Sequence, residues 1–387
     1  MRVLGPPAPG SGAAMAERKK IRLADPCLTA AEERAAVEVI RSGRVVAGPR
    51  VEELEARLAS LTGRAHAVAL SSGTAALLAL MHGLGVGPRS KVVVPALAFP
   101  AAAQAAAFLG ARVVACDVEP KTLNASARTI RAVLEREGRA DLVVAVDLFG
   151  VPAEAPAILS LLAAEGIAFA VDAACSIGAS LDGRPCGAFG DAAIFSFHPR
   201  KLVTTGEGGA VLTDDGELAS RLRWFRNVGA SRGAFLGAGL NLRPSEIGAA
   251  IGCVQLSRLE EIIARRALLA ARYGALPLRV QAAPAGARRN HQTYAAFLPE
   301  EQGKAGRDAL IAHLASQGVE AQVASICLGS CGPLAAALGV SADATPVSRA
   351  AADLGVALPL HGGLDEGDVD RVAGDVRDWL ERSGVTG

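Results

Sequence analysis

Short apolar runs alternate with longer alanine- and leucine-rich segments from about residue 66 onward. The apolar runs have the length and the β-branched composition of buried strands, and they lie at 66–70, 91–94, 112–118, 142–146, 167–171, 192–197 and 209–213. Helical patterns lie between most of the early runs. Continuous apolar strands that alternate with helices indicate a mostly parallel sheet covered by helices on both faces. The pattern predicts an α/β fold whose ligand site lies beyond the carboxyl ends of the strands.

A second region with a different pattern begins near residue 244. Its first segment, 244–273, is predicted to be a long amphipathic helix because its apolar residues recur at helical spacing: Ile247, Ile251, Val254, Leu256, Leu259 and Ile263. The stretch 277–289 is rich in proline, alanine and glycine, which is typical of a linker. The pattern beyond it predicts a strand at 293–298, a helix at 307–317, an irregular segment at 325–332 and a terminal helix at 365–382.

These patterns divide the chain into two domains and a leader. We expect a large α/β domain at 21–275, with an N-terminal arm at 21–50, and a small C-terminal α+β domain at 276–387. Residues 1–14 are rich in proline and glycine, and they lack the basic start and the apolar core of a signal peptide. We therefore expect residues 1–20 to form a disordered leader.

Charge and cysteine content favour a small-molecule partner in the cytoplasm. The 387 residues include 40 basic and 39 acidic ones, so the formal net charge of +1 gives no reason to expect a nucleic acid or an anionic membrane as partner. No apolar run reaches the roughly 20 residues that a membrane span needs. The seven scattered cysteines indicate a reducing cytoplasm. Their spacing, without a matching cysteine or histidine pair, predicts no metal site.

Lys201 is the first candidate for chemistry. Only six of the 40 basic residues are lysines, and Lys201 lies between a predicted strand and the glycine-rich run 204–209. A lysine amine can lose its proton and condense with a carbonyl, whereas an arginine guanidinium cannot. The position therefore favours Schiff-base chemistry at Lys201. A surface lysine in a turn is the competing interpretation.

Two further features follow predicted strands, at the edge where a ligand is expected. Ser72, Gly73 and Thr74 open a helix, where free N–H groups and the helix dipole suit a phosphate. The alternative for this serine is an ordinary N-cap. Asp172 ends another strand, and a carboxylate there would keep a pyridine nitrogen protonated. The alternative for Asp172 is a helix or turn cap.

Phe99 and Asn241 are weaker candidates. Phe99 follows a strand and could stack on a flat ring, although a core phenylalanine is about as plausible in a chain with 4% aromatic residues. Asn241 precedes the long amphipathic segment and could donate to a phosphate, with capping of that helix as the alternative.

The order of these features along the chain resembles that of fold-type I pyridoxal-phosphate (PLP) enzymes. Within that group it is similar to the DegT/DnrJ/EryC1/StrS family, known mostly as sugar aminotransferases. The resemblance spans about residues 21–380. It includes further matches at Ser42-Gly43, Gly48-Pro49, Glu52, Gly190-Asp191, Phe195-Ser196-Phe197, Gly206-Glu207-Gly208-Gly209, Arg243, 249–252 and 358–361. The resemblance therefore implies a large domain with a mostly parallel sheet between helices, and a small C-terminal domain.

The resemblance also implies a role for each candidate. Lys201 would hold PLP as a Schiff base and move the proton, Asp172 would pair with the ring nitrogen, and Phe99 would stack on the ring. The phosphate would be held by Ser72, Gly73, Thr74 and Ser196. Asn241 would complete the phosphate site from the neighbouring subunit, so a homodimer with shared active sites is implied.

The implied activity is transfer of an amino group from glutamate or glutamine to a keto-sugar nucleotide or keto-cyclitol. The setting would be sugar, surface-glycan or antibiotic biosynthesis. Two alternatives stay open: a sugar 3-dehydratase of the same family, which has histidine in place of the lysine, and a catalytically silent PLP-binding regulator or partner subunit. Three departures from the family pattern concern the acceptor. Cys175 stands where glutamine is usual, 239–242 replaces Gly-Tyr-Asn-Tyr, and no His-Tyr-Pro-like element is evident at 325–329.

Overall fold

The computed structural model describes residues 19–384 except 47 and 232. Most of the expected leader, including residues 1–14, therefore lies outside the described residues. Lys19 and Lys20 are described, and their amines form ion pairs with Asp368 and Glu320.

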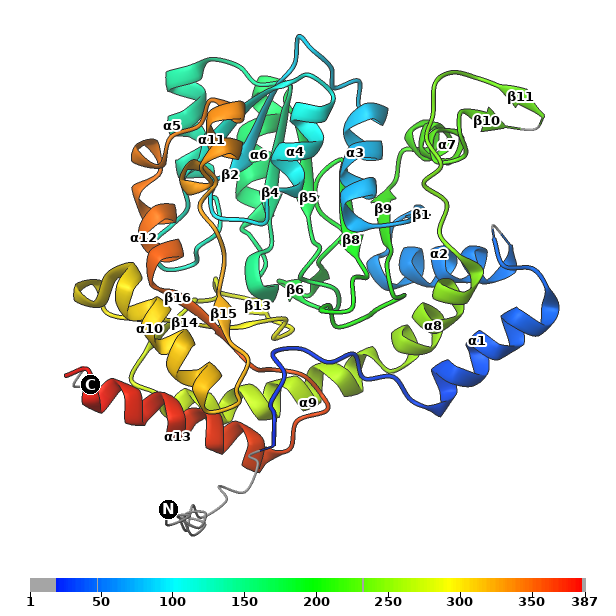
Figure 1. Cartoon of the computed structure of the whole chain (residues 1–387). Coiled ribbons are helices and arrows are strands. Elements are labelled where there is room, and N and C mark those ends of the chain that lie inside the picture. Colours follow the sequence, from blue (N-terminus) through cyan, green and yellow to red (C-terminus); the bar gives the residue numbers. More distant parts are fainter. Residues whose placement is uncertain (1–18, 47, 232, 385–387) are drawn as a thin grey trace, which may run out of the picture.

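A seven-stranded sheet forms the centre of the larger part of the molecule (Figure 1). Its order is β1 (His66–Leu70), β9 (Gly209–Thr213), β8 (Ala192–Ser196), β5 (Ala168–Asp172), β4 (Leu142–Val146), β2 (Lys91–Pro95) and β3 (Arg112–Cys116). All seven apolar runs are strands, with ends that differ by at most two residues from the prediction. β9 runs antiparallel to both of its neighbours, and the pairs from β8 to β3 are parallel. The prediction of a mostly parallel sheet is confirmed.

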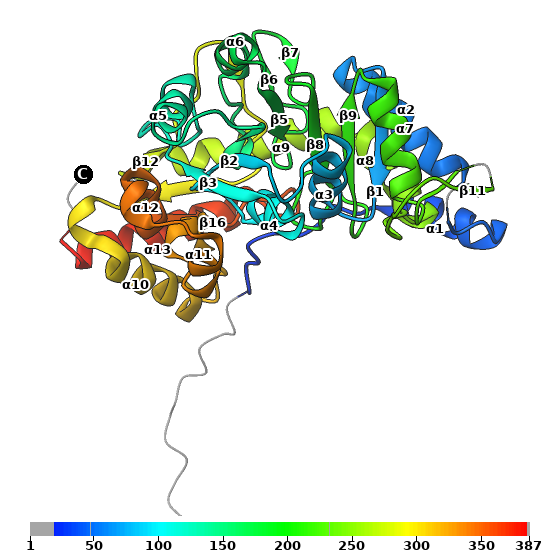
Figure 2. The ribbon, with the colours of Figure 1, turned by 90° about the horizontal axis from the view of Figure 1, so that it is seen from above.

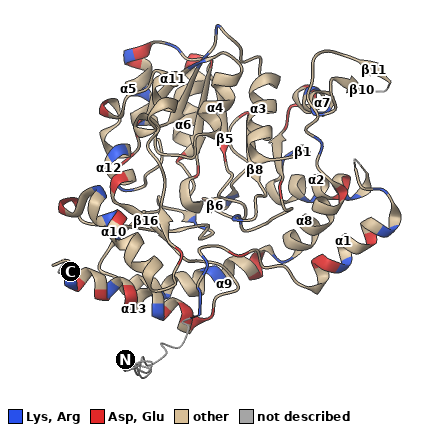
Figure 3. Ribbon diagram, viewed as in Figure 1, with Lys and Arg blue, Asp and Glu red and all other residues tan. Residues whose placement is uncertain are grey.

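Helices cover both faces of this sheet (Figure 2). Because side chains alternate along a strand, Val143 and Ala145 of β4 face one core while Val144 faces the other. The first core is closed by α2 (Pro49–Thr62), α5 (Ala127–Glu137), α6 (Ala155–Glu165) and α8 (Glu246–Ser257). The second is closed by α3 (Gly73–Gly83), α4 (Ala101–Phe108) and α7 (Gly216–Phe225). The strands of the sheet are almost free of charge, and charged residues of both signs lie on outer helices (Figure 3).

The segment 244–273 forms two helices instead of the one that its helical spacing predicts. α8 ends before Arg258, whose ψ of 6° is not helical, and α9 (Leu259–Arg272) begins directly after it. α9 packs into two cores, since Ile262 and Ile263 face the large sheet while Leu269 and Ala270 face the C-terminal unit. The domain boundary that we propose at 275–276 falls just after this shared helix.

A four-stranded sheet forms the C-terminal unit. Its order is β12 (Arg279–Val280), β14 (Tyr294–Phe297), β16 (Gly355–Leu358) and β15 (Gln322–Val323). The helices of this unit are α10 (Gly303–Ser316), α11 (Pro333–Leu338), α12 (Pro346–Leu354) and α13 (Glu366–Arg382). The expected linker is partly regular: it contains β12 and also β13 (Ala287–Arg288), which joins a small sheet with β6 (Ser180–Leu181) and β7 (Arg184–Pro185). This segment is thereby hydrogen-bonded to both parts of the molecule.

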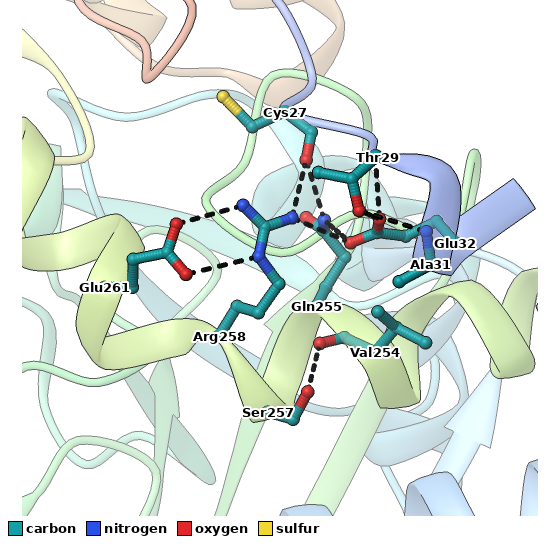
Figure 4. A network of polar contacts seen from close by, with 9 residues as sticks. All are labelled: Cys27, Thr29, Ala31, Glu32, Val254, Gln255, Ser257, Arg258 and Glu261. Atoms are coloured by element: carbon teal, nitrogen blue, oxygen red, sulfur yellow. Dashed lines mark hydrogen bonds and ion pairs between the residues drawn. The ribbon is translucent and has the colours of Figure 1, made fainter.

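The N-terminal arm is attached to the junction of α8 and α9 through a buried carboxylate. Thr29 and Glu32 form a capping box at the start of α1 (Ala30–Ser42). Glu32 is 2% exposed, and it also accepts hydrogen bonds from Gln255 Nε2 (2.7 Å) and Arg258 Nη1 (3.1 Å) (Figure 4). Burial alone would raise the pKa of Glu32, but the hydrogen bonds from Thr29 and Gln255 outweigh it and lower this pKa to about 2. Glu32 therefore stays ionised and fixes the arm.

Two features are absent from the described residues. None of the described helices is long and apolar enough to cross a membrane. The described part of the chain also has no group of three or more histidine, cysteine, aspartate or glutamate side chains that could hold a metal ion.

Candidate active site

Asp172 is the last residue of β5, in the middle of the large sheet. Its side chain is 8% exposed, and its Oδ1 accepts a hydrogen bond from the Ala174 N–H at 3.0 Å. Oδ2 receives no hydrogen bond from the described residues. Burial raises the pKa of Asp172, while the Ala174 N–H and the positive charge of Lys201 work in the opposite direction. The carboxylate thus has room for one more donor or cation.

Lys201 lies on the loop that follows β8, the strand next to β5. The loop is fixed locally by a hydrogen bond of 2.8 Å from the Lys201 N–H to the His198 carbonyl. The half-buried side chain extends to the loop after β5, where Nζ donates to Sγ of Cys175 at 3.1 Å. The structure therefore brings together the lysine and the strand-end aspartate that the sequence singled out.

The turn after β1 meets the end of β8. Ser72 is the N-cap of α3, and its Oγ accepts a hydrogen bond from the Ala75 N–H at 3.0 Å, so the capping interpretation holds for its side chain. Gly73 and Thr74 form the first turn of α3, where backbone N–H groups have no partner within the helix. A Cβ on Gly73 would lie 2.8 Å from Cβ of Ser196, so only glycine allows this contact. Ser72, Gly73, Thr74 and Ser196 therefore form one small cradle.

Phe99 is not a core residue and Asn241 is not a helix cap, so neither has the structural role that was the alternative to ligand binding. Phe99 lies between β2 and α4 with 75% of its surface exposed, so it is not a core residue. Asn241 does not cap α8, because Ser245 does so by accepting from the Gly248 N–H. The Asn241 side chain is exposed and makes no hydrogen bond to the described residues. Its neighbour Leu242 binds the residue that precedes the cradle, since the Leu242 carbonyl accepts from the Ser71 N–H at 2.9 Å.

The sequence did not reveal three residues beside Lys201. Cys175 was noted as a departure from the family pattern but not as a contact of the lysine. Asn290 and Gln292 follow the linker-like stretch and hold the backbone of the loops that carry Cys175 and Lys201. A buried amide side chain that binds the backbone of a distant loop leaves no recognisable pattern in the sequence around it. Only Cys175 could have been singled out, because it stands where the family usually has glutamine.

A comparison with known protein families decides the identity. The model of the DegT/DnrJ/EryC1/StrS aminotransferase family matches residues 26–377. The chain belongs to this family. As a DegT/DnrJ/EryC1/StrS protein it is a PLP-dependent aminotransferase, and its fold is that of the solved aminotransferases.

Several relatives of the family are similar over most of their length. GDP-perosamine synthase of Caulobacter vibrioides is 32% identical over 335 residues, which cover 84% of this chain and 88% of that protein. The aminotransferase TlmJ from Streptoalloteichus hindustanus is 34% identical, with a TM-score of 0.87 over 94% of this chain and 100% of that one. An aminotransferase of the family from Brucella abortus is 32% identical, with a TM-score of 0.82 over 90% of this chain and 95% of that one.

The residues present fit the PLP of this family. The first turn of α3, at Gly73 beside Ser196, has N–H groups without a partner in the helix, and a phosphate needs such donors. The buried Asp172 carboxylate has an oxygen left for a protonated ring nitrogen, and Phe99 offers an exposed apolar ring at the same sheet edge. Lys201 supplies an amine beside Asp172.

Proposed function

We propose that the protein transfers an amino group from glutamate or glutamine to a keto-sugar nucleotide or keto-cyclitol. The observation that carries the proposal is the pairing of a half-buried amine, Lys201, with a buried strand-end carboxylate, Asp172, that lacks a full set of partners. The names of the relatives favour a sugar or cyclic keto acceptor, because they include a GDP-perosamine synthase and an AHBA synthase. Antibiotic or glycan biosynthesis is the corresponding setting.

The roles we propose follow from where the side chains lie. When bound, PLP supplies an aldehyde for Schiff-base formation and a ring that withdraws electrons. Ser72, Gly73, Thr74 and Ser196 bind the phosphate, and Phe99 covers one face of the ring. Asp172 keeps a proton on the ring nitrogen. Lys201 Nζ takes up the proton that the donor's α-carbon loses and passes it on within the same half-reaction, and in the second half-reaction it makes the reverse transfer, which ends with a proton on the acceptor's carbon.

We propose a homodimer in which Asn241 serves the partner's site. Exposed apolar side chains gather after α1 and around the hairpin β10 (Ala230–Ser231) and β11 (Ala234–Phe235): Val45, Val46, Val228, Phe235, Leu236 and Leu240. α1 and this hairpin extend from the same end of the molecule in both views (Figures 1 and 2). An apolar surface there favours association with a second copy.

The half-reactions test the activity. The PLP-loaded protein mixed with glutamate or glutamine should release one keto acid per active site, and the resulting amine form should aminate one member of a panel of keto-sugar nucleotides and keto-cyclitols. A silent regulator would bind PLP and release no keto acid. A 3-dehydratase would release a deoxygenated sugar without a new amine.

Mixed dimers test the shared site. Lys201→Ala and Asn241→Asp chains, dissociated and re-mixed, should form heterodimers with one wild-type site. That site should hold PLP more tightly than the sites of the Asn241→Asp homodimer, where a carboxylate repels the phosphate. If heterodimers formed and none of their sites bound PLP more tightly than the Asn241→Asp homodimer, Asn241 would not belong to the partner's site.

A further inference from the structure

The Lys201 amine has a defined partner that the proposed chemistry does not use. Its Nζ donates a hydrogen bond to Sγ of Cys175 at 3.1 Å. Cys175 lies three residues after Asp172, and both members of the pair are half-buried. A hydrogen bond from Nζ to the thiol uses one N–H of the amine, so in the neutral amine the lone pair points away from the sulfur. The thiol thereby restricts the direction in which the amine accepts a proton.

Asn290 fixes the loop that carries Cys175. Its side chain is completely buried, and Nδ2 donates to the carbonyls of both Cys175 and Ile177 at 2.9 Å. Its Oδ1 accepts from the Gln292 N–H at 2.9 Å, so both ends of this amide are used. A second anchor is the Ser176 hydroxyl, which donates to Oδ2 of the buried Asp147 at 2.6 Å. The thiol loop is therefore held from two sides.

Gln292 fixes the loop that carries Lys201. Its side chain is 7% exposed and contacts the backbone on both sides of the lysine. Oε1 accepts from the Leu202 N–H at 3.1 Å, and Nε2 donates to the Arg200 carbonyl at 2.7 Å. The buried Arg266 in turn donates to the carbonyls of His291 and Gln292 at 2.9 and 2.6 Å. Because a buried polar network with all its members bonded is rigid, one short segment sets the separation of thiol and amine.

We propose that Cys175 is a positioning residue for Lys201: its thiol orients the reactive amine, and Asn290 and Gln292 hold the pair at hydrogen-bonding distance. This proposal rests on the proposed function, in which the Lys201 amine carries the proton. Cys175 makes and breaks no bond itself. A thiol is a weak hydrogen-bonding partner, so it directs the amine without binding it strongly.

The charged groups around Lys201 are separate from Cys175. Asp172 from β5 is affected by the charge of Lys201, and so is His198 on the same loop. Glu207 Oε1 lies 3.9 Å from Nε2 of His198, and Arg200 directly precedes Lys201 in the chain. A Cys175 substitution leaves all of these groups in place, so a changed reactivity of the amine reports the thiol contact.

The first test uses the protein without cofactor. Lys201 is reductively methylated with formaldehyde across a pH series, and the extent is read by peptide mass spectrometry. In Cys175→Ala the amine is no longer held against the thiol, so the extent of Lys201 methylation at each pH should rise about threefold, whereas the matched control Cys331→Ala should behave as wild type. Gln292→Met, which keeps the length of the side chain but loses both hydrogen bonds, should raise the extent of methylation as Cys175→Ala does.

The second test uses the PLP-loaded protein with glutamate in single turnover. Cys175→Ala should slow the step about tenfold with unchanged donor affinity, and Cys175→Ser should recover part of the loss. If Cys175→Ala showed the same Lys201 methylation and the same single-turnover rate as the wild-type protein, the positioning role would be overturned. This outcome decides the question even if Gln292→Met failed to fold. Failure of the proposed function has a different signature: the wild-type protein would then release no keto acid, while the methylation series would still report the Cys175 contact.

Discussion

Glu32 and Asp172 are both carboxylates buried at least nine-tenths, yet their surroundings have opposite effects. Glu32 accepts hydrogen bonds from Thr29, Gln255 and Arg258, and its pKa falls to about 2 (Figure 4). Asp172 accepts one hydrogen bond from a backbone N–H, and burial raises its pKa. The difference separates two uses of a buried charge. The chain itself supplies the hydrogen-bond donors that Glu32 needs, and Glu32 fixes the arm. It leaves one carboxylate oxygen of Asp172 without a donor.

Asp172→Asn should give the largest effect, and it should fall on activity. A neutral amide cannot hold a proton on the ring nitrogen, so the donor half-reaction should slow by roughly 10³-fold, a loss comparable to that of one electrostatic contact to developing charge. The free energy of unfolding of the cofactor-free protein should stay level or rise, because a poorly satisfied buried charge is removed. Single-turnover kinetics with glutamate and urea unfolding measure both. A near-normal rate would remove Asp172 from the mechanism.

Glu32→Gln should lower stability and leave activity nearly unchanged, which is the reverse of the effect of Asp172→Asn. The substitution leaves Arg258 without its buried partner charge, so the free energy of unfolding should fall by about 2–4 kcal/mol. The single-turnover rate of the folded protein should stay within about twofold of wild type, since a distant anchor leaves the reacting groups in place. Urea unfolding at pH 7 provides the measurement. Unchanged stability would mean that the network in Figure 4 is not what fixes the arm.

The stabilisation by Glu32 should depend on pH in a predictable direction. Its pKa is lowered in the folded state, from its usual 4.5 to about 2. The contribution of ionised Glu32 to the free energy of unfolding is therefore fully present above pH 4.5 and is lost as pH falls toward 2. The total loss is about 3 kcal/mol. The gap in unfolding free energy between wild type and Glu32→Gln should narrow over this range. A gap that is constant from pH 7 to pH 3 would contradict the lowered pKa.

Asp172 should show an effect of the opposite sign on the stability of the cofactor-free protein. Its pKa is raised on folding, so its contribution to stability is greatest below its usual pKa of 3.8 and declines as pH rises through the folded value. Relative to wild type, Asp172→Asn should gain stability as pH rises from 3 to 6. Parallel stability curves for the two proteins would show that burial does not perturb this carboxylate.

Much of the fold and part of the site could be predicted from the sequence. The seven strands were evident because a strand buried on both faces is apolar throughout. Asp172 and Ser196 lie at the ends of such strands, and the turn at Ser72 follows another, so their shared edge of the sheet could be predicted. Their roles, and that of Asn241, stay predictions.

Tertiary contacts determine what the sequence did not reveal. Helical spacing continues from α8 into α9, and no local pattern indicates the break at Arg258, whose side chain binds Glu32 of the arm. Proline and glycine made 277–289 resemble a linker, although Ala287–Arg288 pairs with β6. The contact between Cys175 and Lys201 depends on the shapes of two loops, which Asn290 and Gln292 set from about 90 to 115 residues away.

Covalent trapping of the cofactor tests the central claim most directly, because it asks which amine forms the Schiff base. The PLP-loaded protein is reduced with borohydride and digested, and the peptides are mapped by mass spectrometry. We predict one pyridoxyl group, on Lys201, with none in Lys201→Ala treated in the same way. Specific labelling of Lys19, Lys20, Lys91, Lys121 or Lys304 in the wild-type protein would contradict the account, because none of these lysines faces Asp172.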